Sequence, residues 1–426
     1  MGLLLVSAFS TYLAGLWMEK EDTNDKKRWL ISFGSIVLNL GILFFFKYYN
    51  FFVQAFADAF TLFGKELSVS TLNIILPIGI SFYTFSALSY SIDVYRRRVN
   101  TTKDILAYLA YVLFFPSLLS GPISRAAKQL PQYLEKREFR YAEAVNACKI
   151  ILWGGVLKLC VADRLGIYVD AVYGNIAQHN GTTLFLSQVL YTIQIYADFA
   201  GYSLMAIGCG KLLGIELQTN FIRPYLSKTV TEFWRRWHIS LTTWFRDYIY
   251  FPLGGNRVKK MRWIMNIMIV FIISGLWHGA AYTFLIWGAL HGICMILERL
   301  LYRDKMKQIS DRITFPNVIR IFITFNIVSL AWIFFRTANI SDAFEIIGKI
   351  FTSTGKIFLD ADSMVYGFAF VALLFLKDFM DEFFPGKVLL FNNKHLVVRW
   401  ISYVAVVCLI LLFGVLDGGS FIYFQF

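Results

Sequence analysis

The chain has 426 residues, of which 57% are hydrophobic and 16% charged, and its formal net charge is +13. Because soluble domains carry about a quarter charged residues, this composition excludes an ordinary soluble protein and indicates a polytopic membrane protein. The positive charge does not predict a nucleic-acid partner, because the basic residues lie in short loops between apolar runs, where they orient a membrane protein and contact membrane lipid.

Apolar segments follow one another along the whole chain, with no linker rich in Pro, Ser or Gly between them. They are 2–18, 29–47, 72–92, 145–170, 183–210, 264–281, 282–300, 319–336, 363–379 and 398–415. Each is close to the roughly 20 residues that a helix needs to cross a bilayer. The first has no basic region before it and no convincing cleavage site, so we interpret it as a retained helix. The sequence therefore predicts an all-α membrane protein of about ten spanning helices, with residues 1–426 forming one integral domain.

Basic clusters between these segments predict which loops face the cytoplasm. The clusters lie at 20–28, 96–103, 125–140, 223–262 and 303–320. The loops 48–71, 173–182 and 337–362 carry no comparable basic excess, so we expect them on the outer side.

Two segments do not fit simple crossings. Residues 105–120 are apolar but have basic clusters on both sides, and Pro116 and Pro122 interrupt them, while residues 211–252 mix apolar with charged residues. We interpret both as re-entrant or interfacial, which is tolerated at membrane depth only where the backbone is buried in protein or lines a cavity. An internal cavity is therefore implied, and either a transport path or a reaction chamber would satisfy it.

The stretch 234–248 divides into two faces when it is placed on a helix. The apolar face holds Trp234, Trp237, His238, Leu241, Trp244, Phe245 and Tyr248. The polar face holds Arg235, Arg236, Ser240, Thr242, Thr243, Arg246 and Asp247. A basic face opposite an aromatic one is typical of a helix at a membrane–water boundary. His238 lies on the apolar face, so it is either a site residue or an anchor of this helix.

Two further histidines lie within apolar segments, His278 in SGLWHGAAY and His291 in GALHGI. Beside them are glycines spaced four residues apart, Gly275 with Gly279 and Gly288 with Gly292. Small residues at this spacing permit the close approach either of two helices or of a substrate to the imidazole. For His278 a catalytic role and a core histidine hydrogen-bonded across helices both remain open, and for His291 the structural role is favoured.

Asp198 lies in YTIQIYADFAGYS, inside an otherwise uncharged segment, with Gln194 and Tyr202 on the same helical face. An intramembrane carboxylate is expected to face the protein interior and to pair. We predict an arginine of residues 223–246 as its partner. Structural pairing is favoured over direct catalysis.

The five cysteines are scattered and have no metal-ligand spacing, so neither a disulfide framework nor a metal site is predicted. The usual sequence motifs of hydrolases, metalloproteases, nucleotide-binding proteins and redox proteins do not occur. Histidine-centred chemistry in a membrane cavity remains, most naturally the activation of a hydroxyl for acyl transfer.

These residues resemble the membrane-bound O-acyltransferases, and among them the bacterial proteins that O-acetylate alginate and cell-wall polysaccharides. The resemblance is carried by TEFWRRWHISLTTWFRDYIYFPLGGNR, followed about forty residues after its histidine by GLWHG. LPIGISFYTFSALSYSIDVYR, FFPSLLSGPISR, YADFAGYS and NFIRPYLS support it over residues 29–345. Two features depart from the family. Its members usually have further hydrophobic helices before the segment that matches 1–18, so this chain looks short at its front, and Leu204 stands where alginate-type members often have an acidic residue.

The resemblance implies that His278 is the essential catalytic histidine and His238 a second, inner-side signature histidine, in a bundle of spanning helices around a central tunnel that thins the membrane. The loop charges independently place His238 on the inner side and His278 on the outer side. Residues supporting this tunnel would be Asp198, Arg235, Trp237, Trp277 and Gln194. The implied acyl donor is cytosolic acetyl-CoA. The implied acceptor is an extracellular polysaccharide or an extracytoplasmic partner acetyltransferase, reached from the bacterial plasma membrane.

Three alternatives stay open. The family's D-alanyl-transferring branch, which acts on teichoic acids, shares the histidine motifs, although PLGGNR and SLAWIFFRTANISDAFEII favour the acetylating branch. A transporter or flippase would use the same cavity without a histidine base. A scaffold subunit of a polysaccharide secretion complex would need neither histidine.

Overall fold

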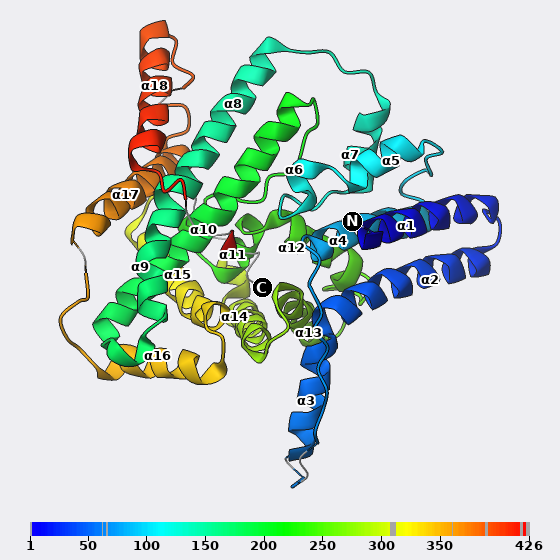
Figure 1. Cartoon of the computed structure of the whole chain (residues 1–426), viewed down its shortest axis with the longest axis horizontal. Coiled ribbons are helices and arrows are strands. Elements are labelled where there is room, and N and C mark those ends of the chain that lie inside the picture. Colours follow the sequence, from blue (N-terminus) through cyan, green and yellow to red (C-terminus); the bar gives the residue numbers. More distant parts are fainter. Residues whose placement is uncertain are drawn as a thin grey trace. The chain divides into compact units, whose positions relative to one another are not determined.

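The computed structural model describes residues 2–61, 63–64, 67–306, 312–359, 361–387, 391–417 and 421–422. Helices dominate these residues, and no strand occurs among them (Figure 1). The predicted all-α class is therefore confirmed. The stretches long and apolar enough to cross a bilayer are 2–20, 25–61, 141–173, 260–278, 282–302, 315–336 and 396–413. The chain is thus a multi-pass membrane protein, while the number of about ten crossings stays a prediction.

The chain forms two compact units, one of residues 1–147 with 206–218 and one of 148–205 with 219–426. The first unit contains α1 (Gly2–Lys20), α2 (Asp25–Leu43), η1 (Phe44–Tyr48), α3 (Tyr49–Thr61), α4 (Ile80–Tyr95), α5 (Ile105–Val112), α6 (Phe115–Leu118) and α7 (Ala126–Leu134). Helices α1, α2 and α4 pack on one another. Buried Arg28 links them, because its guanidinium donates to the carbonyls of Met18 at 2.6 Å and Val94 at 2.9 Å.

Two predictions for the first unit are wrong. The predicted span 72–92 is helical only from Ile80, because Pro77 lacks an N–H and Gly79 adopts a left-handed φ of 76°. The predicted loop 48–71 is helical as far as Thr61. Its sequence YNFFVQAFADAFT is almost as apolar as the helix before it, and the π-helical turn η1 joins the two without a break.

The second unit contains both long helices and short helical segments. They are α8 (Tyr141–Gly155, which begins in the first unit), η2 (Val156–Ala162), α9 (Asp163–Tyr173), α10 (Gly181–Leu212, whose last turns belong to the first unit), α11 (Val230–Arg236), α12 (Ile239–Phe245), η5 (Arg246–Tyr250), α13 (Lys260–His278), α14 (Tyr282–Met306), α15 (Phe315–Arg336), α16 (Ile340–Thr352), α17 (Ala361–Phe383) and α18 (Leu396–Phe413). Short 3-10 turns lie at Ile176–Gln178 and Pro224–Leu226. Its core contains the fully buried indoles of Trp237, Trp287 and Trp332.

The two segments predicted to be re-entrant or interfacial are built of short helices. Residues 105–120 hold α5 and α6, with Pro116 in the first turn of α6, and residues 211–252 hold α11, α12 and η5. At about 1.5 Å per residue, none of these helices could cross a bilayer alone.

Candidate functional site

The helix predicted over 234–248 is interrupted at the histidine that it carries. Helix α11 ends at Arg236, Trp237 is extended, and His238 has the left-handed dihedral angles φ 41° and ψ 54°. A bulky residue adopts this conformation only where surrounding contacts demand it. The prediction of one continuous helix is therefore wrong, and His238 lies at the junction of two short helices.

Asn220 and its neighbours satisfy the backbone groups that the interruption releases. The carbonyl of Asn220 accepts from the N–H of Ile239 at 2.9 Å, and its side-chain Oδ1 accepts from the N–H of Ser240 at 3.2 Å. The N–H of Ile222 donates to the carbonyl of Arg236 at 3.0 Å. WRRWHIS contains no Pro or Gly, so the sequence carries no local signal for the break, and the hydrogen bonds that accommodate it come from the loop before it.

The aromatic face of this segment contacts protein. Trp234 lies 5.2 Å from Phe271 of α13, and Trp237 lies 5.1 Å from Trp332 of α15, measured between ring centroids. Both tryptophans are buried. Protein aromatic side chains therefore cover Trp234 and Trp237, and the position of the segment at a membrane–water boundary stays a prediction.

His238 and His278 belong to one buried cluster. Their ring centroids are 6.3 Å apart, and Trp277 contacts both rings, at 5.8 Å and 5.0 Å. The exposed fractions of the two histidines are 0% and 4%. The structure thus brings the two predicted histidines together, while the inner and outer sides assigned to them stay predictions. Burial also lowers the pKa of His238 to about 3, so its imidazole is neutral at physiological pH.

Two aromatic residues on other helices also contact His278. Trp287 of α14 and Phe335 of α15 meet its ring edge-to-face, at 5.0 Å and 5.2 Å. His291 lies on the other side of Trp287, 5.1 Å away, and its Nδ1 accepts from the indole N–H of Trp234 at 3.3 Å. This bond agrees with the structural role favoured for His291.

Glycines bring α13 and α14 together around these side chains. A Cβ on Gly275 would lie 2.2 Å from the carbonyl oxygen of Phe284, and a Cβ on Gly288 would lie 2.2 Å from that of Phe271. Of the two possibilities that the glycine spacing left open, the structure shows the close approach of two helices. This contact sets where His278, the last residue of α13, lies relative to Trp287.

Asp198 pairs with a lysine, so the predicted arginine partner is wrong. Its Oδ1 lies 2.7 Å from Nζ of Lys158, which also lies 2.7 Å from Oδ1 of Asp163. Lys158 can reach Asp198 because Gly154 and Gly201 let the two helices approach closely. Sequence reasoning missed Lys158, which lies inside an apolar stretch, ILWGGVLKLCVADRL.

The arginines near the histidine segment have other partners. Arg223 and Arg236 bind Glu382 of α17 at 2.6 Å and 2.8 Å. Burial would raise the pKa of Glu382, but the hydrogen bonds from these guanidinium groups lower it below its ordinary value. Gln194 is buried on α10, one turn before Asp198, with its amide nitrogen against Gly166.

A cavity of about 680 Å³ adjoins the cluster. It is lined by Thr231, Trp234, Arg235, Leu241, Thr242, Phe245, Arg246, Tyr250, Asn256, Ile267, Val270, Phe271, Ser274, Met295 and Arg299. Arg235 and Arg246 are exposed, while Trp234 and Phe271 are buried, so the cavity joins a cationic rim to an apolar floor. Neither histidine is among these described lining residues, but Ser274 lies one turn before His278 on α13.

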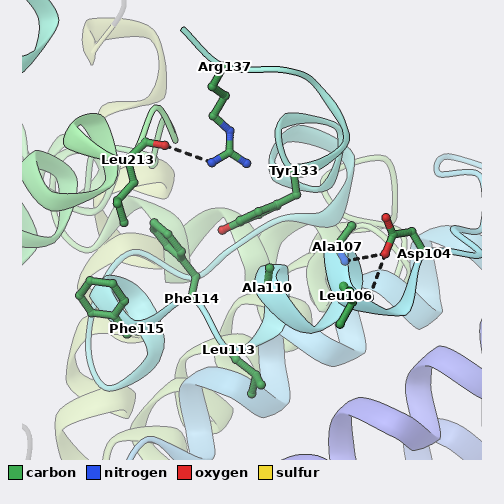
Figure 2. A pocket seen from close by; sticks show the side chains of 10 residues that line it. All are labelled: Asp104, Leu106, Ala107, Ala110, Leu113, Phe114, Phe115, Tyr133, Arg137 and Leu213. Atoms are coloured by element: carbon green, nitrogen blue, oxygen red, sulfur yellow. Dashed lines mark hydrogen bonds between the residues drawn. The ribbon is translucent and has the colours of Figure 1, made fainter. Parts of the chain in front are cut away.

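A second cavity, of about 560 Å³, lies in the first unit and is a weaker candidate site (Figure 2). Asp104 accepts from two backbone N–H groups at the start of α5. Arg137 donates to the carbonyls of Leu213 and Gln132, and its guanidinium lies 5.4 Å from the Tyr133 ring. Both charged groups of this cavity therefore have structural tasks, and the rest of the lining is mostly apolar.

Residues 1–337 match the model of the membrane-bound O-acyltransferase family. The chain is 40% identical over 332 residues to a probable alginate O-acetylase of Pseudomonas aeruginosa, covering 78% of this chain and 61% of that protein. It is 34% identical over 372 residues to the peptidoglycan O-acetyltransferase of Helicobacter pylori, covering 81% and 69%. It is 30% identical over 277 residues to the teichoic acid D-alanyltransferase of Bacillus subtilis, covering 62% and 69%. The chain thus spans less than two thirds of the length of the first of these relatives.

Replacing Asn220 tests whether it holds the break at His238. Asn220→Ala leaves the N–H of Ser240 without this acceptor, so we expect stability to fall by about 1–3 kcal/mol. Thermal unfolding of the detergent-solubilised protein measures the change. Ser203→Ala is the control, because it removes only the hydroxyl to which Asn220 donates at 3.2 Å. An Asn220→Ala protein as stable as the parent would contradict this role.

The contact between α13 and α14 makes a second prediction. Gly275→Ala places a methyl group against a backbone carbonyl, and we expect it to lower stability by about 1–3 kcal/mol. Gly348→Ala on α16 is the matched control, because its Cβ would meet nothing within 4 Å and alanine favours a helix. Tryptophan fluorescence during heating follows both. Equal melting temperatures for the two variants would show that α13 and α14 can move apart without a loss of stability.

Proposed function

Because this chain belongs to the membrane-bound O-acyltransferase family, we propose that it transfers an acetyl group from a cytosolic thioester, acetyl-CoA, to a hydroxyl group outside the cytoplasm. The acceptor is an extracellular polysaccharide, or a partner acetyltransferase that passes the group on. The protein would act in the bacterial plasma membrane. The predicted single domain would then form the tunnel that joins the two sides.

The observation that carries this proposal is the distance of 6.3 Å between the rings of His238 and His278, inside an aromatic cluster beside a cationic cavity. An aromatic enclosure excludes water, which protects a thioester from hydrolysis. The cationic rim suits a donor that carries phosphate groups, with Arg235 in contact with them. Trp237 and Trp277 would form walls of the reaction site.

In the proposed step His278 is the general base. Its imidazole accepts the proton of the acceptor hydroxyl while the oxygen attacks the thioester carbonyl. The tetrahedral intermediate then expels the thiolate, which takes the proton back from the imidazolium, so the products are the ester and the free thiol. His238, neutral at this pH, would polarise the donor carbonyl through an N–H group. Asp198 and Gln194 would support the helix behind the site.

Acetyl is preferred to D-alanyl as the acyl group, because the relatives named as alginate O-acetylases are more similar to this chain than those named as D-alanyltransferases. A transporter or flippase remains the second candidate, because the cationic cavity could also accept a substrate that is not chemically changed.

His278→Ala removes the proposed base, and we expect acetyl transfer to fall by about 10²–10⁴-fold. The assay supplies labelled acetyl-CoA and an acceptor polysaccharide to the purified, reconstituted protein, and it follows the label by mass spectrometry. His395→Ala is the control, because that histidine is exposed and lies outside the cluster. If the parent protein moves the label across the membrane but leaves it on coenzyme A, the transporter hypothesis is correct.

A further inference from the structure

The segment Phe421–Ile422 enters the interior of the second unit. Both side chains are buried, with exposed fractions of 5% and 7%. They lie against α10, on the turn that carries Asp198, Phe199 and Tyr202. A segment more than two hundred positions away along the chain therefore packs beside the histidine cluster.

The side chain of Asp198 binds the backbone of the segment Phe421–Ile422. Its Oδ2 accepts from the N–H of Ile422 at 2.8 Å, while its Oδ1 lies 2.7 Å from Nζ of Lys158. Asp198 is buried on α10, with an exposed fraction of 1%. Each carboxylate oxygen therefore has its own partner. A carboxylate bound to a backbone N–H makes a short, strong hydrogen bond, and the bond depends on the N–H at position 422 rather than on the side chain there.

Aromatic contacts connect the segment to His238. The Phe421 ring stacks on Tyr202 with 4.8 Å between centroids, and it meets Phe199 edge-to-face at 5.7 Å. Phe199 in turn meets the His238 ring edge-to-face at 4.7 Å. Phe421 therefore packs against Phe199, and Phe199 packs against His238. A displacement of Phe421 would loosen the packing of Phe199 and, through it, of His238.

We propose that Asp198 is a positioning residue that fixes Phe421–Ile422 as a wall of the histidine cluster, and that this wall keeps His238 closed to water. Asp198 acts through the Ile422 N–H and through Phe199, and it takes no part in proton transfer. This explains why a carboxylate lies beside an apolar site that excludes water. The consequence for acyl transfer rests on the proposed function, but the closure of His238 does not.

Ile422→Pro tests the wall directly, because proline lacks the N–H and leaves the Asp198–Lys158 ion pair untouched. Ile422→Val is the matched control, because it keeps the N–H and a β-branched side chain. The first measurement is the rate at which diethyl pyrocarbonate modifies His238 in the purified full chain, read by peptide mass spectrometry. We expect about tenfold faster modification in Ile422→Pro and a rate equal to the parent's in Ile422→Val.

The second measurement is acetyl transfer by the same proteins. We expect Ile422→Pro to lower kcat with little change in the KM of the acetyl donor, because the cationic rim of the cavity is intact. If Ile422→Pro does not fold, Phe421→Ala replaces it, with the same expected rise in His238 modification. A folded Ile422→Pro or Phe421→Ala protein in which His238 stays as protected as in the parent overturns the inference. If His238 is modified faster in the variant, as expected, but the parent transfers no acetyl group, the inference about Phe421–Ile422 holds and the proposed function is wrong.

Discussion

A break in a buried helical segment, where a neighbouring loop supplies hydrogen bonds to the released backbone groups, is the constraint on which the rest of this site depends. At membrane depth an unsatisfied N–H or carbonyl costs several kcal/mol, so a helix can end inside the protein only where other groups replace its own hydrogen bonds. Asn220 and Ile222 do this around Trp237 and His238. A continuous helix would leave His238 in a regular row of side chains along one face. The left-handed turn instead aims its imidazole towards Phe199, Trp277 and His278.

His278 is positioned in the same cluster in a different way. Helix α13 carries His278 at its very end, and the missing side chains of Gly275 and Gly288 let α14 lie directly against it. Trp287 can then meet the His278 ring. Buried aromatic pairs each contribute about 0.5–1.5 kcal/mol beyond the area that they cover. Small residues and large ones therefore act together, because the glycines determine how close the rings come.

Features that depend on neighbouring residues could be predicted from the sequence. The apolar runs identified an all-α membrane protein, the glycine spacing offered a close contact of helices as one of two possibilities, and the isolation of Asp198 identified a buried, paired carboxylate. Features that depend on distant residues could not. Asn220 accepts from the N–H groups at the break beside His238, the partner of Asp198 is Lys158 inside another apolar run, and Glu382 binds the arginines that seemed available to Asp198. In each case the partner is carried on a different segment, and no periodicity reports such a pairing.

The amphipathic pattern of 234–248 could not identify what covers its aromatic face, and the reason is general. A basic face opposite an aromatic one fits a lipid boundary, but it fits an aromatic protein interior equally well, because hydrocarbon and buried tryptophan are both apolar surroundings. What distinguishes the two is the cost of the histidine. In lipid an imidazole has few partners, whereas in this cluster His238 lies among the rings of Phe199, Trp277 and His278, next to a chamber with arginines at its rim. An ionisable residue in the middle of an aromatic face therefore indicates that protein surrounds that face. The ionisable residue is better evidence on this point than the amphipathic pattern.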